Sequence, residues 1–197
     1  MSDNPNPEPR RRKQVRLPGY DYSQPGRYFI TVCTFEKARI FGEVHDGYFD
    51  PSQAGNIVRE CWYELPAHYA GVHLDKFVVM PNHIHGILIF SRPVGEELKP
   101  GVRVSPTRTV SEVVRGLKTF SARRINEMTG ATGKVIWQRG YFEHIVRTNK
   151  GFAAIRQYIR DNPGAWEKDP ENYASPRKGG FETRPYGPSM GGRLTKT

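Results

Sequence analysis

Residues 77–90 constrain the fold more than any other stretch of this chain. Two apolar runs flank a turn-forming Pro-Asn pair, and the second run opens with His83, Ile84 and His85. Side chains two residues apart on a strand point to the same face, so the two histidines converge while Ile84 points the other way. Two neutral imidazoles on one face suit a divalent metal. By itself, however, the histidine pair is about equally compatible with a structural role and with a metal site.

The order of expected elements along the chain predicts an α+β fold. Strands are expected at residues 27–34, 72–80, 84–90 and 135–146 (the last interrupted at 138–140), with a short hairpin around 46–47. Helices are expected from a cap at Ser52 to a stop or bend at Pro66, at 110–128 and at 151–162. This order fits a split β-α-β, ferredoxin-like domain, in which helices pack on one face of a mostly antiparallel sheet.

Composition narrows the class of protein. The 197 residues carry a formal net charge of +10, which favours a polyanionic partner, nucleic acid first. The alternative is a soluble protein with a basic tail, since residues 10–13 (Arg-Arg-Arg-Lys) alone supply four of these charges. No apolar run approaches the roughly 20 residues of a membrane span, and the polar N-terminus lacks a signal segment. We therefore expect a cytoplasmic protein without membrane contact. Cys33 and Cys61 lack a CxxC pattern, which predicts free thiols.

The same composition predicts the domain limits. We expect a flexible basic arm at residues 1–26, one folded domain at 27–166 and a flexible tail at 167–197, because both ends are rich in Gly, Pro and charge.

A second group of candidate residues lies on the last expected helix. Tyr158 and Asn162 are four residues apart and share one face of that helix. A phenol oxygen beside a two-histidine metal site is a credible nucleophile for phosphoryl transfer, and Asn162 or Asp161 could complete the metal ligands. Tyr141 is the competing nucleophile, although a tyrosine next to Phe142 on a core strand more often serves packing.

Four segments of the chain resemble one known family. Residues 80–85 (Met-Pro-Asn-His-Ile-His) resemble the His-hydrophobic-His motif of the single-tyrosine HUH transposases. Residues 158–163 (Tyr-Ile-Arg-Asp-Asn-Pro) resemble the Tyr-Ile-x-x-Asn-Pro motif of the REP-associated tyrosine transposases. Residues 17–23 and 137–144 are also similar to that branch. The resemblance spans residues 16–166 with the motifs in order, which is far more specific than a lone His-x-His.

The resemblance implies an HUH endonuclease fold and a transposase-like activity on single-stranded DNA, at or near hairpins such as REP-like palindromes. In this family a tyrosine attacks a backbone phosphate and leaves a 5′-phosphotyrosine link and a free 3′-OH. Carried over to this chain, Tyr158 is the nucleophile and His83, His85 and Asn162 bind Mg²⁺ or Mn²⁺. A neutral Asn amide is a modest ligand where other branches place a stronger one. Members of the branch can act as monomers, so we expect a monomer, with a dimer as the alternative.

Basic residues near the C-terminal half are the expected DNA contacts, through the phosphate backbone. They are Arg115, Lys118, Arg123, Arg124 and Arg139. The alternative is that they form only the solvated side of a helix.

Two other functions stay open. One is a catalytically idle regulator that binds hairpin DNA. The other is a metal-dependent RNA-processing or hydrolytic enzyme that uses the histidine pair with water as nucleophile. The roles of Glu143 and His144 are also open.

Overall fold

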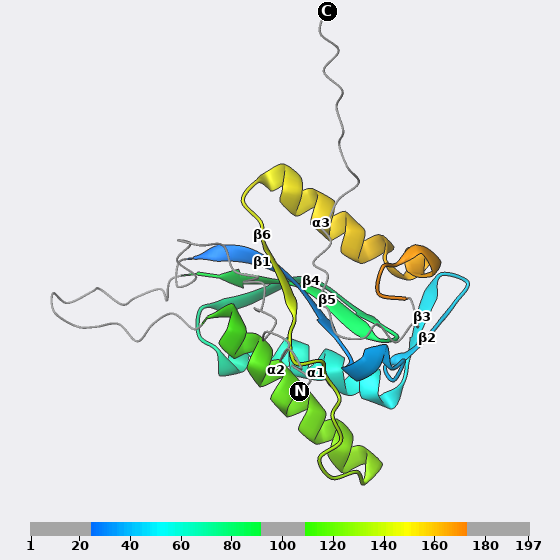
Figure 1. Cartoon of the computed structure of the whole chain (residues 1–197). Helices are drawn as coiled ribbons and strands as arrows, with labels where there is room; N and C mark the ends of the chain where they lie inside the picture. Colours follow the sequence, from blue (N-terminus) through cyan, green and yellow to red (C-terminus); the bar gives the residue numbers. More distant parts are fainter. Residues whose placement is uncertain (1–24, 92–108, 173–197) are drawn as a thin grey trace, which may run out of the picture.

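A four-stranded antiparallel sheet forms the centre of the computed structural model, which describes residues 25–91 and 109–172 (Figure 1). Its strands are β1 (Gly26–Cys33), β4 (Val72–Met80), β5 (His83–Phe90) and β6 (Phe142–Ile145). They pair in the order β4-β5-β1-β6, and every pairing is antiparallel. Helix α1 (Gln53–His68) joins β1 to β4, with β5 lying between these two strands. This is the expected split β-α-β unit, and the ferredoxin-like α+β fold is confirmed.

The helices occupy both faces of the sheet. Helix α1 and helix α2 (Val110–Thr129) pack on one face, as expected. Helix α3 (Asn149–Asp161) lies on the opposite face, where it packs against Phe29 and Ile87 (Figure 1). The expectation of helices on one face therefore holds for α1 and α2 and is wrong for α3.

Strand β5 contributes to both faces because its side chains alternate. Ile84 and Leu88 enter the large core under α1 and α2, together with Trp62. His83 and His85 point to the other face, beside Ile87 and α3. The hairpin of β4 and β5 places Met80 opposite His83.

Helix α1 begins where expected and runs through Pro66, where a stop or a bend was expected. The Ser52 hydroxyl caps it by accepting the Gly55 N–H at 3.1 Å. The helix continues past Pro66 to His68. A proline removes only one hydrogen bond of the helix, and the buried side chains of Trp62 and Leu65 hold this last turn against the core.

Two shorter segments also bear on the predictions. The expected hairpin is present as β2 (Gly42–His45) and β3 (Tyr48–Pro51), joined by Asp46 and Gly47, both with positive φ. The strand expected at 135–137 is reduced to a single bridge between Trp137 and Thr34.

The C-terminal boundary lies further along the chain than expected. Helix α3 is followed by the 3₁₀ helix η2 (Pro163–Lys168), and Asp169 is 3% exposed. Glu171 and Asn172 make side-chain contacts with the body of the domain. Asp169, Glu171 and Asn172 thus contact the domain, with Asp169 turned into the interior beside Asn162, whereas Glu167, Lys168 and Pro170 are exposed. The rest of the predicted arm and tail, 1–24 and 173–197, lies outside the described residues, as does 92–108. No helix of the described part is long and apolar enough to cross a membrane.

Candidate active site

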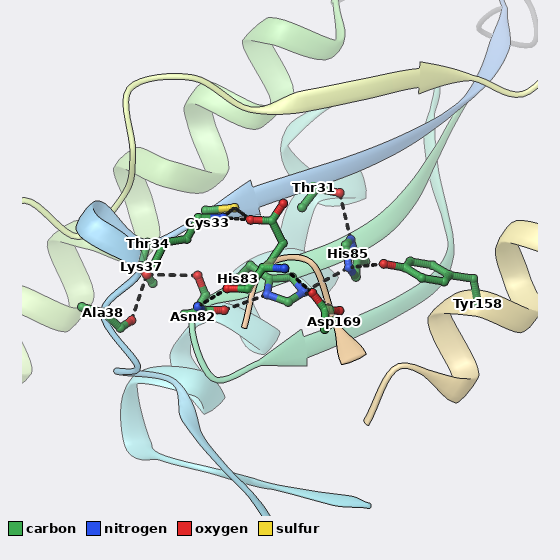
Figure 2. Close-up of polar contacts among 11 residues, drawn as sticks. Thr31, Cys33, Thr34, Lys37, Ala38, Asn82, His83, His85, Tyr158 and Asp169 are labelled. Carbon is green, nitrogen blue, oxygen red and sulfur yellow. Dashed lines mark hydrogen bonds and ion pairs between the residues drawn. The ribbon is translucent and has the colours of Figure 1, made fainter. Parts of the chain in front are cut away.

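The two histidines face each other at the start of β5 (Figure 2). Their Nε2 atoms are 3.0 Å apart. The Nδ1 of His83 lies 2.8 Å from the Asn82 Oδ1, and the Nδ1 of His85 lies 2.9 Å from the Thr31 hydroxyl. Because the Asn82 amide nitrogen donates to the Glu171 carbonyl, its Oδ1 is the atom that accepts from His83. An outer partner on Nδ1 leaves Nε2 available to a metal ion.

Burial keeps both imidazoles neutral. Desolvation lowers the pKa of His83 well below its ordinary value, with His85 and Lys37 acting in the same direction. Desolvation and the charge of Lys37 lower the pKa of His85 to about 3. The neutral imidazole is the form that binds a metal ion, so the pair is ready for a cation at neutral pH.

Asp169 supplies a carboxylate to the same point. Its Oδ2 lies 3.8 Å from the His83 Nε2, and ligand atoms of His83, His85 and Asp169 all lie within 4.8 Å of one another. Burial raises the pKa of Asp169 to about 6, while the Asn162 side chain and Lys37 act against this rise. The sequence gives no sign of this residue, because it begins a segment with the composition of a tail.

Asn162 lies beside Asp169 at the C-terminal end of α3. Its side chain is 2% exposed, and its Oδ1 has no hydrogen-bond partner among the described residues. A buried, unpaired amide oxygen next to a carboxylate is compatible with a ligand role. The role of Asn162 as a metal ligand stays a prediction.

Helix α3 carries Tyr158 to the histidines. The Tyr158 hydroxyl is 3.3 Å from the His85 Nε2, and its ring packs edge-on against Phe29. Ile155 and Ile159 anchor α3 in the apolar cluster on this face of the sheet. The structure therefore brings Tyr158 to His83 and His85, which lie more than 70 positions earlier in the chain.

Tyr141, the competing nucleophile, lies elsewhere. Its hydroxyl donates to the Glu143 carboxylate at 2.9 Å and lies 3.0 Å from the Ser111 hydroxyl on α2. Its ring packs against the core on the α1 and α2 face. His144 is exposed on β6. None of these groups belongs to the cluster around His85.

Some of the residues expected to contact DNA have partners within the protein, and the others are exposed. Arg124 forms a two-pronged ion pair with Glu64 of α1, at 3.0 and 2.7 Å. Arg123 pairs loosely with Glu127, at 3.8 Å. Both lie on α2, which packs against the face of the sheet opposite the histidines.

Lys118 also has internal partners. Its ammonium donates to the backbone carbonyls of Gln138 and Gly140, at 2.8 and 2.7 Å. Burial lowers the pKa of Lys118 to about 8. Lys118 thus supports the loop that presents the exposed Arg139, and Arg115 is exposed on α2. The DNA contacts of all five residues remain predictions.

Comparison with known proteins bears on the family of this chain. The family model described as "Transposase IS200 like" matches residues 101–162, a stretch that includes Tyr158. An uncharacterised protein of Haemophilus influenzae is 34% identical over 169 residues, covering 80% of this chain and 91% of the relative.

A solved structure shares the fold. It is a REP-associated tyrosine transposase bound to a REP hairpin, with a TM-score of 0.52 and 19% identity, covering 75% of this chain and 72% of that one. The sequence motifs and the matched family model together identify the family. This chain belongs to the IS200-like transposases and shares its fold with a solved REP-associated tyrosine transposase.

Proposed function

We propose that this protein is a metal-dependent endonuclease and strand transferase for single-stranded DNA. It cleaves at or near hairpins and forms a 5′-phosphotyrosine intermediate. The observation that carries the proposal is the 3.3 Å contact between the Tyr158 hydroxyl and the His85 Nε2, inside a cluster of metal-ligand side chains. A nucleophile next to such a cluster is the arrangement that phosphoryl transfer requires.

The residues present fit a divalent ion. Two neutral imidazoles and the Asp169 carboxylate converge, and the Asn162 side chain lies beside Asp169. The Asp169 Oδ2 and Asn162 Oδ1 are buried without a hydrogen-bond partner in the described part of the chain. We assign His83, His85 and Asp169 as ligands of Mg²⁺ or Mn²⁺, with Asn162 as a fourth. When bound, such an ion polarises the scissile phosphate and offsets negative charge in the transition state.

The chain's own groups perform the transfer. The Tyr158 oxygen forms a bond to phosphorus as the bond from phosphorus to the 3′-oxygen breaks. The phenol proton passes to water, and the departing 3′-oxygen takes up a proton. One phosphoester replaces another, so no nucleotide cofactor is needed. Packing of the Tyr158 ring against Phe29 and His85 orients the nucleophile.

Hairpin DNA is the proposed partner, and the protein would act on it in the cytoplasm as a monomer. The solved relative is described as bound to a REP hairpin, and the chain carries a formal net charge of +10. The exposed Arg115 and Arg139 are the first candidates for backbone contacts.

The proposal is tested by incubating the full chain with labelled hairpin DNA, single-stranded flanks and Mn²⁺, followed by a denaturing gel. We expect a covalent adduct that is lost in Tyr158→Phe and kept in the matched variant Tyr141→Phe. The reverse pattern would overturn the assignment of the nucleophile. Hairpin binding without any adduct would favour the idle regulator, and cleavage that persists in Tyr158→Phe would favour water as the nucleophile.

A further inference from the structure

The turn that follows β1 has an unusual backbone. In the 3₁₀ turn η1 (Phe35–Lys37), Glu36 and Lys37 have φ values of 52° and 58°. Two consecutive non-glycine residues in the left-handed region are rare, and such strain persists where neighbouring contacts enforce it. Here the Thr34 hydroxyl ties the turn to the carbonyls of Ala38 and Asn82, at 2.8 and 3.0 Å.

The strained turn directs the side chain of Lys37 toward the histidine site. The Lys37 ammonium lies 3.2 Å from the Cys33 sulfur and forms an ion pair with the Glu171 carboxylate. Only 26% of the Lys37 side chain is exposed. Figure 2 shows Lys37 and Cys33 on one side of the histidine pair and Tyr158 on the other. A lysine is normally left in water, so this placement asks for a function.

Two contacts place the Lys37 ammonium beside the cluster. Cys33, whose sulfur it approaches, lies directly opposite His83 in the pairing of β1 with β5, and Glu171, its ion-pair partner, comes two residues after Asp169. Lys37 is thus a fixed cation next to the cluster that we assign to the metal. The present partner of this ammonium is the Glu171 carboxylate, which a phosphate oxygen would replace. Phosphate oxygens are acceptors of the same kind, and a lysine ammonium binds them as a point charge.

We propose that Lys37 is a further catalytic residue, whose ammonium binds a non-bridging oxygen of the scissile phosphate. This inference rests on the proposed function. During transfer the Tyr158 oxygen bonds to phosphorus, the 3′-oxygen departs and takes up a proton, and the non-bridging oxygens keep their negative charge. A preformed cation beside them stabilises that charge in a site from which water is largely excluded.

A purely structural role is the alternative, in which Lys37 only tethers the segment around Glu171. Glu171→Gln removes the other charge of the same ion pair and is the matched test. If Lys37 is only a tether, Lys37→Met and Glu171→Gln should slow adduct formation equally. Phosphate binding predicts that Lys37→Met slows adduct formation roughly 100-fold or more, whereas Glu171→Gln changes it by no more than about fivefold. Lys134→Met, at an exposed lysine, controls for the lost charge.

A neutral substrate makes the test specific to charge. We would measure adduct formation on hairpin DNA with Mn²⁺, using either a normal scissile phosphate or a methylphosphonate at that position. We expect the defect of Lys37→Met on the normal phosphate, partial rescue by Lys37→Arg, and equal rates for wild type and Lys37→Met on the methylphosphonate. Circular dichroism and thermal unfolding would confirm that each variant is folded.

The outcomes separate the two proposals. Two results would overturn the role of Lys37 and leave the proposed function standing, provided that wild type forms the adduct. One is that Lys37→Met forms the adduct as fast as wild type. The other is that Lys37→Met slows adduct formation as much on the methylphosphonate as on the phosphate. If wild type forms no adduct on either substrate, both are overturned.

Discussion

The two faces of the central sheet are built from the same strands and have opposite contents. Under α1 and α2, the sheet carries a large apolar core around Trp62 and Leu88. On the other face, a small apolar cluster under α3 adjoins the buried polar groups of His83, His85 and Asp169. The difference shows how a small domain can bury a polar site. One face carries most of the apolar packing, so the other can hold groups that are costly to desolvate.

The sharpest test of this division is to remove a histidine. His83→Ala should reduce metal affinity by more than the roughly 10–100-fold typical of losing an outer partner of a metal ligand. Adduct formation should fall with it, while thermal stability of the metal-free protein changes little or rises, because a desolvated polar side chain has been removed. Calorimetric titration with Mn²⁺ and a melting curve measure the two effects.

His144→Ala is the matched control for that variant, since His144 is an exposed histidine on the same sheet. It should leave metal affinity unchanged. Equal losses in the two variants would show that the metal binds outside the proposed cluster.

The complementary change removes packing from the other face. Trp62 is fully buried and stacks on Phe77 with ring centroids 4.5 Å apart, and Gly86 leaves the space for its indole. Trp62→Ala should lower the free energy of unfolding by about 3–5 kcal/mol. Metal affinity per folded molecule should stay near wild type.

Tyr63→Ala provides the comparison for Trp62→Ala, because Tyr63 is the next residue on α1 and is 61% exposed. Its effect on urea denaturation should be small. A Trp62→Ala protein that stays as stable as wild type would contradict the division of labour between the faces.

A smaller effect is expected from the partners of the ligands. Asn82 accepts from the Nδ1 of His83 and donates to the Glu171 carbonyl. Asn82→Ala should weaken metal binding by roughly 10–100-fold. Thr31→Ser keeps the hydroxyl that contacts His85 and should bind metal nearly as well as wild type, as titration with Mn²⁺ can check. Unchanged affinity in Asn82→Ala would mean that backbone geometry alone orients His83.

The sequence reveals the parts of this arrangement that depend on local patterns. Alternation along β5 separates Ile84 from the two histidines, and helical spacing places Tyr158 near Asn162, so both were predictable. The place of Asp169 in the site was not predictable, because its burial depends on how the chain turns after η2. The position of Lys37 was not predictable either, because tertiary contacts such as those of Thr34 enforce the left-handed backbone at this non-glycine residue.

The last contrast within the polar face is between its histidines and its carboxylate, and pH separates them. The pKa of His85 is lowered to about 3 and that of His83 well below 6.5, so the unfolded chain gains these two protons first as pH falls. Each histidine then costs about 1.4 kcal/mol of unfolding free energy per pH unit below about 6.5. Asp169 acts in the opposite direction. Its pKa is raised from 3.8 to about 6, so the folded chain gains that proton first.

Between about pH 6 and pH 4 the contributions of His85 and Asp169 oppose each other, with one proton favouring the unfolded chain and one favouring the folded chain, and His83 acts in the same direction as His85. Asp169→Asn removes the compensation, so its unfolding free energy should fall by about 1.4 kcal/mol more per pH unit than that of wild type. Urea denaturation at several pH values, with a chelator present, measures both slopes. Their difference cancels the titration of groups common to the two proteins. Parallel slopes would mean that Asp169 ionises as an ordinary surface carboxylate, which would remove it from the buried cluster and from the proposed metal ligands.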